Sequence, residues 1–470
     1  MRPFDEPEPR RPAHRGGLRA LCLVAGLAAG LTLAGCGGYA STSEAFRQSL
    51  TAGDPQVALT RVNEALEVPA AEQLPSNPKE DTPLLLLERA TILQALGENK
   101  LSARDFQTAD KNLDVLDLTG DTTGEISKYL FSDDATIYKA PPHEKLLLNT
   151  MNMINYLVMG DPSGARVEAR RMLVNRKYLE KEEGEARSMM ALGSYLSGFV
   201  FEVSGEPGPA MRHYGDAHDA GGVPTLAEAV GRLAARSGSS DPRLAELTEN
   251  PPALAEDDAK RGELLVVVQT GMAPFLLPER LPIGAAVVAA SSPGPGARLS
   301  RDEQQRANVF AAKGVLKWVN YPRLQRVALP SAPVDVDVDG QSPAGGVALD
   351  VASKVNAQYE QVKGTLIAAS ITRLITRAVA GELTQAATRS ASNNGLAGLL
   401  VGLAVEGAMT AADTPDTRSW VTLPAAFHIA RARLPAGAHT VRVRYRGRTR
   451  TAQVNLAEGG FAVVNFSDYR

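Results

Sequence analysis

Apolar residues recur at helical spacing from about residue 41 to residue 250, and Gly, Asp and Pro mark the turns between the apolar stretches. This pattern predicts a series of amphipathic helices. One motif recurs within it: a glycine, a small residue five positions later, a bulky or apolar residue after nine, and a small or apolar residue after twelve. Its copies begin at Gly53, Gly97, Gly160 and Gly205.

The motif resembles the tetratricopeptide repeat (TPR), in which a glycine-containing turn joins two antiparallel helices and small residues let them pack closely. We therefore predict a TPR-like α-helical domain, an α-solenoid, over residues 36–255, with a generic helical array as the alternative. The copies are spaced 44, 63 and 45 residues apart, whereas a regular array repeats every ~34 residues, so insertions must interrupt this one. The packing positions of the two best copies are Gly97, Phe106, Ala109, Gly205, Ala210, Tyr214 and Ala217.

The pattern changes at the polar, proline-rich stretch 250–262, which predicts a linker. A mixed α/β region is expected over residues 256–412, with a long helix at 349–392 and an apolar, glycine-rich helix at 395–409. Because this second helix is short and carries Glu406, a buried hairpin helix is favoured over a segment that inserts into the membrane. The expected strands are Leu264–Val268, Ala285–Ala290, Val309–Val319, Arg326–Leu329 and Pro333–Gly340.

Short alternating stretches separated by glycine turns predict a small β module over residues 413–470. This tail resembles the small β-sandwich modules of the PEGA or transthyretin-like type. The residues that carry the resemblance are Leu434, Pro435, Gly437, His439, Val441, Val443, Gly447, Val454, Gly460 and Val464. The expected fold class is therefore multidomain α+β: a TPR-like α-solenoid, a mixed strand and helix region, and a small C-terminal β-sandwich module.

The N-terminus has the features of an export signal. Five arginines precede residue 20, and residues 20–33 contain neither charge nor proline. An apolar stretch of this length is short for a membrane span and is typical of a secretory signal. Leu33, Ala34, Gly35 and Cys36 resemble the lipobox cleaved by signal peptidase II, so residues 1–35 are expected to be a lipoprotein signal peptide. The alternative is a soluble protein that keeps an apolar N-terminus.

Cys36 is the expected lipid attachment site. The only other cysteine, Cys22, lies inside the expected signal, so the mature chain would have no disulfide and no thiol for catalysis or metal binding. Gly37 follows in place of an aspartate, which favours the outer membrane, with the protein facing the periplasm. The order of elements resembles an uncharacterised family of Gram-negative lipoproteins, with the likeness in stretches 262–274, 371–380 and 416–424. The resemblance implies export and anchoring, and it implies no activity.

Charge and motifs point away from catalysis and nucleic acids. The formal net charge is −3 over 470 residues, so there is no basic excess that would favour nucleic acid. The common hydrolase, zinc-protease and nucleotide-binding motifs do not occur in the sequence. No catalytic residue, cofactor or metal is therefore expected. His213 and His218 are five residues apart, but two imidazoles alone predict a solvated helix face rather than a metal site.

An acidic run, Asp335, Asp337 and Asp339 before Gly340, resembles the start of a calcium loop. The twelfth position is Gly346 rather than glutamate, and the alternation of aspartate with valine favours an exposed strand face.

Two further segments are candidates for interaction, and their residues are Asp416, Arg418, Trp420, Arg442, Arg444 and Arg446. Trp420 and Arg418 are residue types that dominate interface hot spots. The favoured alternative is that Trp420 fills the core of the β module while Arg418 ties down its loop. The three later arginines share one strand face by period two and would suit phosphates or cell-wall carboxylates. A solubilising face that blunts an edge strand is the plainer alternative.

These features together predict a membrane-anchored periplasmic lipoprotein that acts as a non-enzymatic protein-interaction scaffold or envelope assembly factor. Its protein partners are expected on the concave surface of the solenoid, and its membrane contact through lipidated Cys36. Two alternatives stay open: a cell-wall-associated enzyme or enzyme regulator, and a periplasmic small-ligand binder. Buried acidic residues that converge in a cleft would favour an enzyme, and a bare concave helical groove would favour a scaffold.

Overall fold

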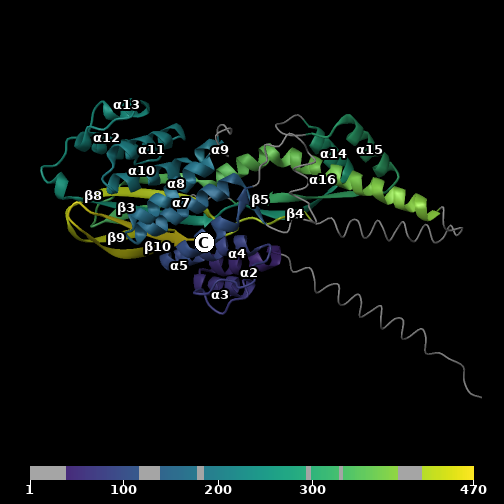
Figure 1. Cartoon of the computed structure of the whole chain (residues 1–470), viewed down its shortest axis with the longest axis horizontal. Coiled ribbons are helices and arrows are strands. Elements are labelled where there is room, and N and C mark those ends of the chain that lie inside the picture. Colours follow the sequence, from purple (N-terminus) through teal and green to yellow (C-terminus); the bar gives the residue numbers. More distant parts are fainter. Residues whose placement is uncertain (1–38, 116–137, 177–184, 293–297, 328–331, 390–414) are drawn as a thin grey trace, which may run out of the picture.

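The computed structural model describes residues 39–115, 138–176, 185–292, 298–327, 332–389 and 415–470. The fold is mixed α+β, with helices in the N-terminal half and sheets in the C-terminal part (Figure 1). Cys36, the lipobox and the apolar segment 395–409 lie outside the described residues, so the expectations for them stay predictions.

Four helix pairs follow one another in the N-terminal half. They are α2 (Tyr39–Ala52) with α3 (Pro55–Ala65), α4 (Thr82–Ala95) with α5 (Asn99–Asn112), α7 (Pro142–Val158) with α8 (Pro162–Arg176), and α10 (Ala191–Val203) with α11 (Pro207–Asp219). Each turn holds the glycine of one motif copy, at Gly53, Gly97, Gly160 and Gly205, and all four have φ between 69° and 89°. Glycine is the residue that adopts this left-handed conformation at least cost, which explains its recurrence.

Small residues let the two helices of a pair approach closely. Phe106, Ala109, Ala210, Tyr214 and Ala217 are all fully buried. In the fourth pair Gly198 of α10 faces Tyr214 of α11, and a Cβ at residue 198 would lie 2.4 Å from the tyrosine ring. The motif positions are therefore packing positions between paired helices. The other described elements before β3 are β1 (Asp114–Val115), β2 (Lys139–Ala140), α9 (Glu185–Ser188), α12 (Leu226–Ser237), α13 (Ala245–Thr248) and two short 3-10 helices, Pro242–Leu244 and Asp258–Lys260.

The described C-terminal part contains a two-stranded hairpin, β4 (Phe275–Pro282) with β5 (Trp318–Gln325), and two larger sheets. The first contains β3 (Gly262–Met272), β7 (Ala344–Asp350), β8 (Pro424–Leu434) and β11 (Phe461–Asp468), in the order β11-β3-β8-β7. In it β3 runs parallel to β11 and antiparallel to β8. The second contains β6 (Asp335–Val338), β9 (Gly437–Tyr445) and β10 (Arg448–Leu456), in the order β10-β9-β6.

The two faces of β3 separate two layers of apolar packing. Leu265 and Val267 belong to the large core shared with the helices. Leu264, Val266 and Val268, which point the opposite way, join a core shared with the second sheet. The order of layers is therefore helices, four-stranded sheet, three-stranded sheet.

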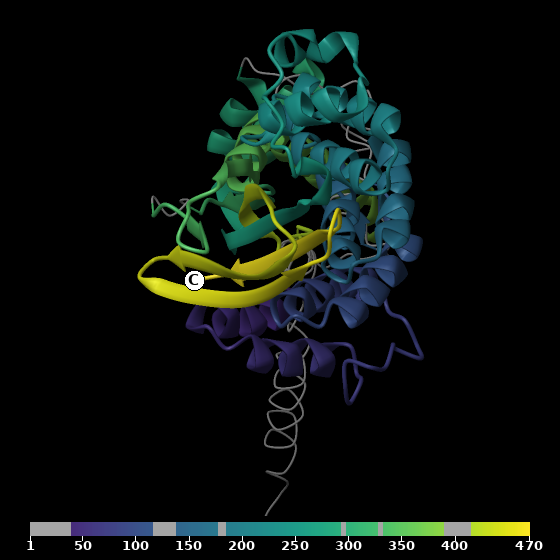
Figure 2. The same cartoon turned by 90° about the vertical axis from the view of Figure 1, so that its left-hand side faces the viewer.

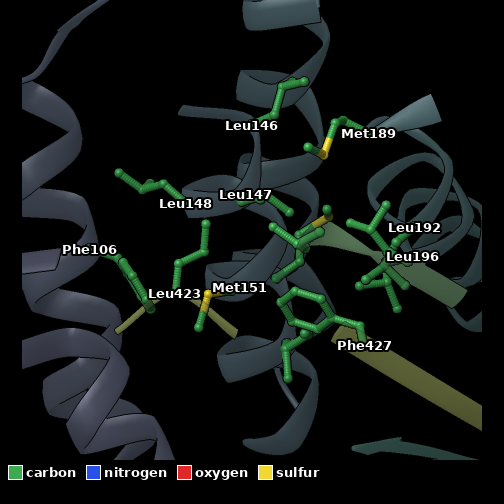
Figure 3. Packing of buried hydrophobic residues seen from close by; sticks show 14 of the residues in the cluster. Phe106, Leu146, Leu147, Leu148, Met151, Met189, Leu192, Leu196, Leu423 and Phe427 are labelled. Carbon is green, nitrogen blue, oxygen red and sulfur yellow. The ribbon is translucent and has the colours of Figure 1, made fainter. Parts of the chain in front are cut away.

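The helices curve around the sheet, so their inner side is filled by the chain itself. Figure 2 shows the purple to teal helices in an arc around the yellow strands. In Figure 3, Met151 of α7 lies near Phe427 of β8 and Leu423, the residue just before β8, and all three belong to one core. The sequence led us to expect a bare concave groove for protein partners. In the described residues, the inner side of the helices is instead packed against the sheet.

A lobe extends from the rest of the molecule, at the right of Figure 1. We define it as the hairpin of β4 (Phe275–Pro282) and β5 (Trp318–Gln325) with α14 (Ile283–Ser291), α15 (Arg301–Ala312) and α16 (Val351–Arg389). It has a hydrophobic core of its own, built around Phe310, Val319 and Ile371.

Two strand predictions were wrong, and both lie in the lobe. Residues 285–290 belong to helix α14, and residues 309–312 end helix α15, so only Trp318 and Val319 of the stretch 309–319 are in a strand. A short apolar run rich in valine and alanine does not distinguish a strand from a buried helix by periodicity. Residues 326–327 are in no strand, and 328–329 lie outside the described part. The strand at Asp335–Val338 and the long helix α16 are confirmed.

The predicted domain boundary at residues 412 and 413 falls within one fold unit. Strands β8 and β11 of the expected C-terminal module pair with β3, which comes about 160 residues before β8. Strand β9 likewise pairs with β6. The described residues 415–470 therefore share two sheets with strands of the mixed region. Alternation reveals a strand but not its partner, so the sequence did not indicate these pairings.

Candidate functional site

The segment Asp416–Thr422 leads into β8 and contains three of the candidate interaction residues from the sequence, Asp416, Arg418 and Trp420. Trp420 is only 1% exposed. Its ring meets Phe106 of α5 edge to face, with centroids 5.8 Å apart. Its Nε1 donates to Thr91 Oγ1 of α4 at 3.0 Å. Trp420 thus fills the core between the helices and the sheet, rather than a core internal to a β module, and it is not available to a partner.

Glu88 of α4 holds the backbone of the same segment. It is fully buried. Its two carboxylate oxygens accept hydrogen bonds from Val421 N at 2.8 Å and Thr422 N at 2.9 Å. The Tyr39 hydroxyl donates to Glu88 and also lies 2.8 Å from the carbonyl oxygen of Ser419. The first residue described in the chain is therefore tied to a segment 380 residues later.

Glu144 of α7 makes a second, similar grip. Its Oε1 accepts from Trp420 N at 3.1 Å, and its Oε2 accepts from the Tyr138 hydroxyl at 2.5 Å. We call Tyr39, Glu88, Tyr138, Glu144 and residues 416–422 the clasp. Two acids from two helices thus bind three consecutive backbone amides of the entering strand.

Burial changes the acid–base properties of both carboxyls. Removal from water raises the pKa of Glu88 to about 7, against the hydrogen bonds from Tyr39, Val421 and Thr422. Burial likewise raises the pKa of Glu144 to about 7, and the neighbouring Glu88 contributes in the same direction. The clasp therefore titrates near neutral pH.

Carboxyls with such pKa values are also found in active sites, so access matters. A cavity of about 420 Å³ opens beside the clasp, and Tyr39, Asp81 and Thr82 are among its lining residues. Glu88 and Glu144 do not line it. Their oxygens are turned toward backbone amides and tyrosine hydroxyls instead. The carboxyls of Glu88 and Glu144 therefore fix a chain segment. The acidic residues that line the cavity are Glu64, Glu67, Glu80 and Asp81 instead.

Arg418 closes the outer side of the clasp. Its guanidinium binds Asp416 at 2.6 Å and Asp81 at 2.8 Å. Although burial opposes it, these two carboxylates raise the pKa of Arg418 above its ordinary value. Arg418 thus ties its own loop to the start of α4, as the favoured alternative in the sequence supposed.

A second buried polar cluster joins the helices to the sheet at Arg431 of β8. Its guanidinium, 1% exposed, binds Glu202 of α10 and Glu263 of β3, both at 2.8 Å. Its Nη1 also donates to the Tyr214 hydroxyl at 3.1 Å. The arginines around Glu263, with Arg431 foremost, lower the pKa of this acid to about 2 in spite of its burial. The motif residue Tyr214 therefore has a second role besides packing.

The arginine row and the acidic run of the sequence meet each other. Asp335 pairs with Arg444 at 2.8 Å, and Asp337 pairs with Arg442 at 3.1 Å, across strands β6 and β9. Arg446 lies in the following turn, where it donates to the carbonyl of the C-terminal residue. Cross-strand pairing of opposite charges accounts for both patterns.

The remaining expected positions do not form a metal site. Asp339 binds His439 at 2.6 Å and accepts from Thr440 N at 2.8 Å. His213 is buried and stacks on Phe201, so it does not lie on a solvated face as predicted, whereas His218 is exposed. Throughout the described residues no group of His, Cys, Asp or Glu is arranged to hold a metal ion.

Sequence reasoning missed Glu88, Glu144, Tyr39 and Tyr138. One signal was present: Glu88 and Arg89 interrupt the apolar stretch of α4, from Leu84 to Leu93. Charged residues inside an apolar helix must have buried partners. The partners themselves lie too far away in sequence to be inferred.

None of the helices in the described ranges is long and apolar enough to cross a bilayer. Comparison with known protein families, curated proteins and solved structures found no match.

Proposed function

We propose that this protein is a lipid-anchored, non-enzymatic interaction protein of the bacterial envelope, held by Cys36 at the periplasmic face of the outer membrane. The observation that carries the proposal is the position of Tyr39. It lies three residues after the expected lipidated cysteine and is already buried in the clasp. The folded body therefore begins at the anchor without a spacer, as suits a protein that works at the membrane surface.

The clasp supports a non-enzymatic function. Its carboxyls have the pKa values of a general acid or base, but catalysis needs a carboxyl within hydrogen-bond reach of a substrate. The carboxylate oxygens of Glu88 and Glu144 instead accept hydrogen bonds from the backbone amides of residues 420–422. We infer that these acids secure the closed arrangement of helices and sheet.

We further propose that the helical half is a TPR-like solenoid and that the strands form a β-sandwich module which closes it. The four glycine turns and the buried small residues support the first part. The apolar core shared by the two sheets supports the second. Because the inner side of the helices is filled, we propose that partners bind to the outer surface of the body.

The experiment is metabolic labelling with palmitate in cells that express the wild type, Cys36→Ser or Cys22→Ser. We expect label in the wild type and in Cys22→Ser and none in Cys36→Ser, because only Cys36 follows the lipobox. Equal labelling of the wild type and Cys36→Ser, or no label in the wild type, overturns the anchoring proposal. Crosslinking from membranes, followed by capture of the wild-type protein, tests interaction separately, and recovery of no partner overturns the scaffold role.

A further inference from the structure

The tip of the lobe combines exposed apolar side chains with basic ones. Val288 of α14 is 68% exposed, Trp318 of β5 47% and Val309 of α15 45%. Lys313 and Lys317 lie between α15 and β5 and are also exposed. We call these five residues the tip. Exposed apolar side chains that occur together in this way mark binding surfaces.

The tip is held together at the far end of the hairpin. Strand register places Trp318 opposite Pro282, at the end away from Phe275 and Gln325. The backbone N–H of Ile283, where α14 begins, donates to the carbonyl of Lys317 at 3.0 Å. The start of α14 therefore lies beside the start of β5, and α14 also packs against α15.

The charge of the lobe indicates what it meets. Between Glu279 and Arg326 there are eight Lys or Arg and three Asp or Glu, in a chain whose net charge is −3. One of these acids, Glu279, is paired with Arg323 at 2.6 Å. By contrast, no charged residue occurs from Leu281 to Ala297, the stretch that includes α14. A basic lobe with an uncharged helix at its tip is complementary to an anionic surface with an apolar interior.

The root of the lobe lies beside the expected anchor. The Arg47 guanidinium of α2 stacks over the Phe275 ring at 3.6 Å. Leu276 N donates to Ser419 Oγ at 3.4 Å, and the Ser419 carbonyl meets Tyr39. Three residues from Tyr39 to Cys36 reach at most about 11 Å, and the eight-residue strand β4 is about 26 Å long. An anchored body therefore has its lobe within reach of the same membrane.

We propose that the tip of the lobe binds an anionic lipid bilayer, with Trp318 and Val288 in the interfacial region and Lys313 and Lys317 at the headgroups. Trp is enriched at membrane interfaces, and lysine near an anionic surface adds attraction. A lipid anchor at one end leaves the folded body free to tilt, so a second contact with the bilayer would orient it. The inference rests on the proposed function for the presence of a membrane nearby, but the binding is a property of the unlipidated chain.

The test uses the unlipidated mature chain from Gly37 onward, which contains every described element, and vesicles of three parts phosphatidylethanolamine to one part phosphatidylglycerol. The chain has two tryptophans, and Trp420 is buried, so a change in emission reports Trp318. We expect emission to move to shorter wavelength on these vesicles and to be quenched by brominated lipid. Unchanged emission, or an equal response to neutral phosphatidylcholine vesicles, overturns the proposal.

Variants distinguish binding through the tip from non-specific adsorption of the protein to vesicles. Val288→Glu is expected to weaken partitioning into the anionic vesicles about tenfold or more, since burial of one such side chain contributes about 1.5–3 kcal/mol. The matched control is Val57→Glu on α3, whose valine is 47% exposed outside the lobe, and it should leave partitioning unchanged. Equal losses in both variants contradict the proposal.

Charge reversal at Lys313 and Lys317 supplies an independent variant, since both positions are exposed and outside helices. Together with a rise in salt, it should weaken the binding through the loss of attraction to anionic headgroups. If neither the charge reversal nor the added salt weakens vesicle binding, the proposal that the tip binds anionic lipid is overturned. Capture of a protein from membranes that depends on Val288, with no vesicle binding, would assign the tip to a protein partner instead. Failure of palmitate labelling, in contrast, concerns only the anchor.

Discussion

The clasp and the tip of the lobe each contain one of the two tryptophans, and they use it in opposite ways. Trp420 is surrounded by core side chains and its Nε1 is hydrogen bonded, whereas nearly half of Trp318 is exposed. The polar groups of the clasp are directed at the chain itself. The tip directs its apolar groups outward. The difference teaches that a residue type typical of interfaces indicates an interface only where the fold leaves it exposed.

The largest effect should come from removing the buried tryptophan. Trp420→Ala leaves a cavity beside Phe106 and removes the partner of Thr91, which should lower the free energy of unfolding by about 3–5 kcal/mol. Trp318→Ala should change it by less than about 0.5 kcal/mol, as an exposed substitution does. Urea unfolding followed by circular dichroism measures both. Similar losses for the two variants would remove the distinction between the clasp and the tip.

A similar loss is expected where the helices meet the sheet at Arg431. Arg431→Ala removes the cation that the buried acids Glu202 and Glu263 share, while Arg236 and Arg433 still pair with them. We expect it to destabilise the fold by about 3 kcal/mol, the lower end for a broken buried ion pair. The control in the lobe is Arg280→Ala, since Arg280 is exposed and its Nε donates to the neutral side chain of Asn320 at 3.1 Å. Chemical unfolding of the two variants should differ clearly, and equal midpoints would show that the buried cation is dispensable.

The clasp should make stability depend on pH. The folded-state pKa of Glu88 is about 7, against an ordinary value of 4.5, so the folded protein binds more protons than the unfolded chain between these values. The contribution of Glu88 to the free energy of unfolding is therefore at its maximum below about pH 4.5. It decreases by up to about 3 kcal/mol as the pH rises from 4.5 through 7. Glu144 should act in the same direction, with its pKa also about 7.

The measurement compares the wild type with Glu88→Gln at pH 5, 6, 7 and 8, because glutamine does not titrate. The free energy of unfolding should decrease less from pH 5 to pH 8 in the variant than in the wild type. This comparison holds even if the substitution changes stability by the same amount at every pH. Burial lowers the pKa of His143 to about 4, so the titration of His143 increases stability as the pH rises to 6.5 and opposes the effect of Glu88. His143 has this effect equally in the wild type and in the variant. Glu64→Gln on the exposed surface of α3 is the control. A pH profile identical to the wild type would show that Glu88 keeps an ordinary pKa.

Local patterns anticipated much of the fold. The glycine motif located all four helix pairs of the described N-terminal half, since a left-handed turn at Gly97 or Gly205 is a local requirement. A β-branched run located β3, and the alternation of valine with aspartate located β6. The apolar run of α14 was misread because short runs fit helix and strand alike. The strands that pair with β3 and the backbone amides that bind Glu88 lie more than 150 residues away, and no local pattern encodes such pairings.

The smallest predicted effect concerns glycines in the two regions. Gly205 has φ of 75° in the turn between α10 and α11, so Gly205→Ala should cost about 1 kcal/mol through backbone strain, although nothing lies within 4 Å of the new Cβ. Gly364 lies within helix α16 of the lobe, also with open space around its Cβ position. Gly364→Ala should therefore stabilise by about 0.5–1 kcal/mol, because alanine favours a helix interior. Thermal unfolding should move in opposite directions for the two variants. A shift of the same sign in both would mean that side-chain contacts, rather than backbone conformation, decide the effect.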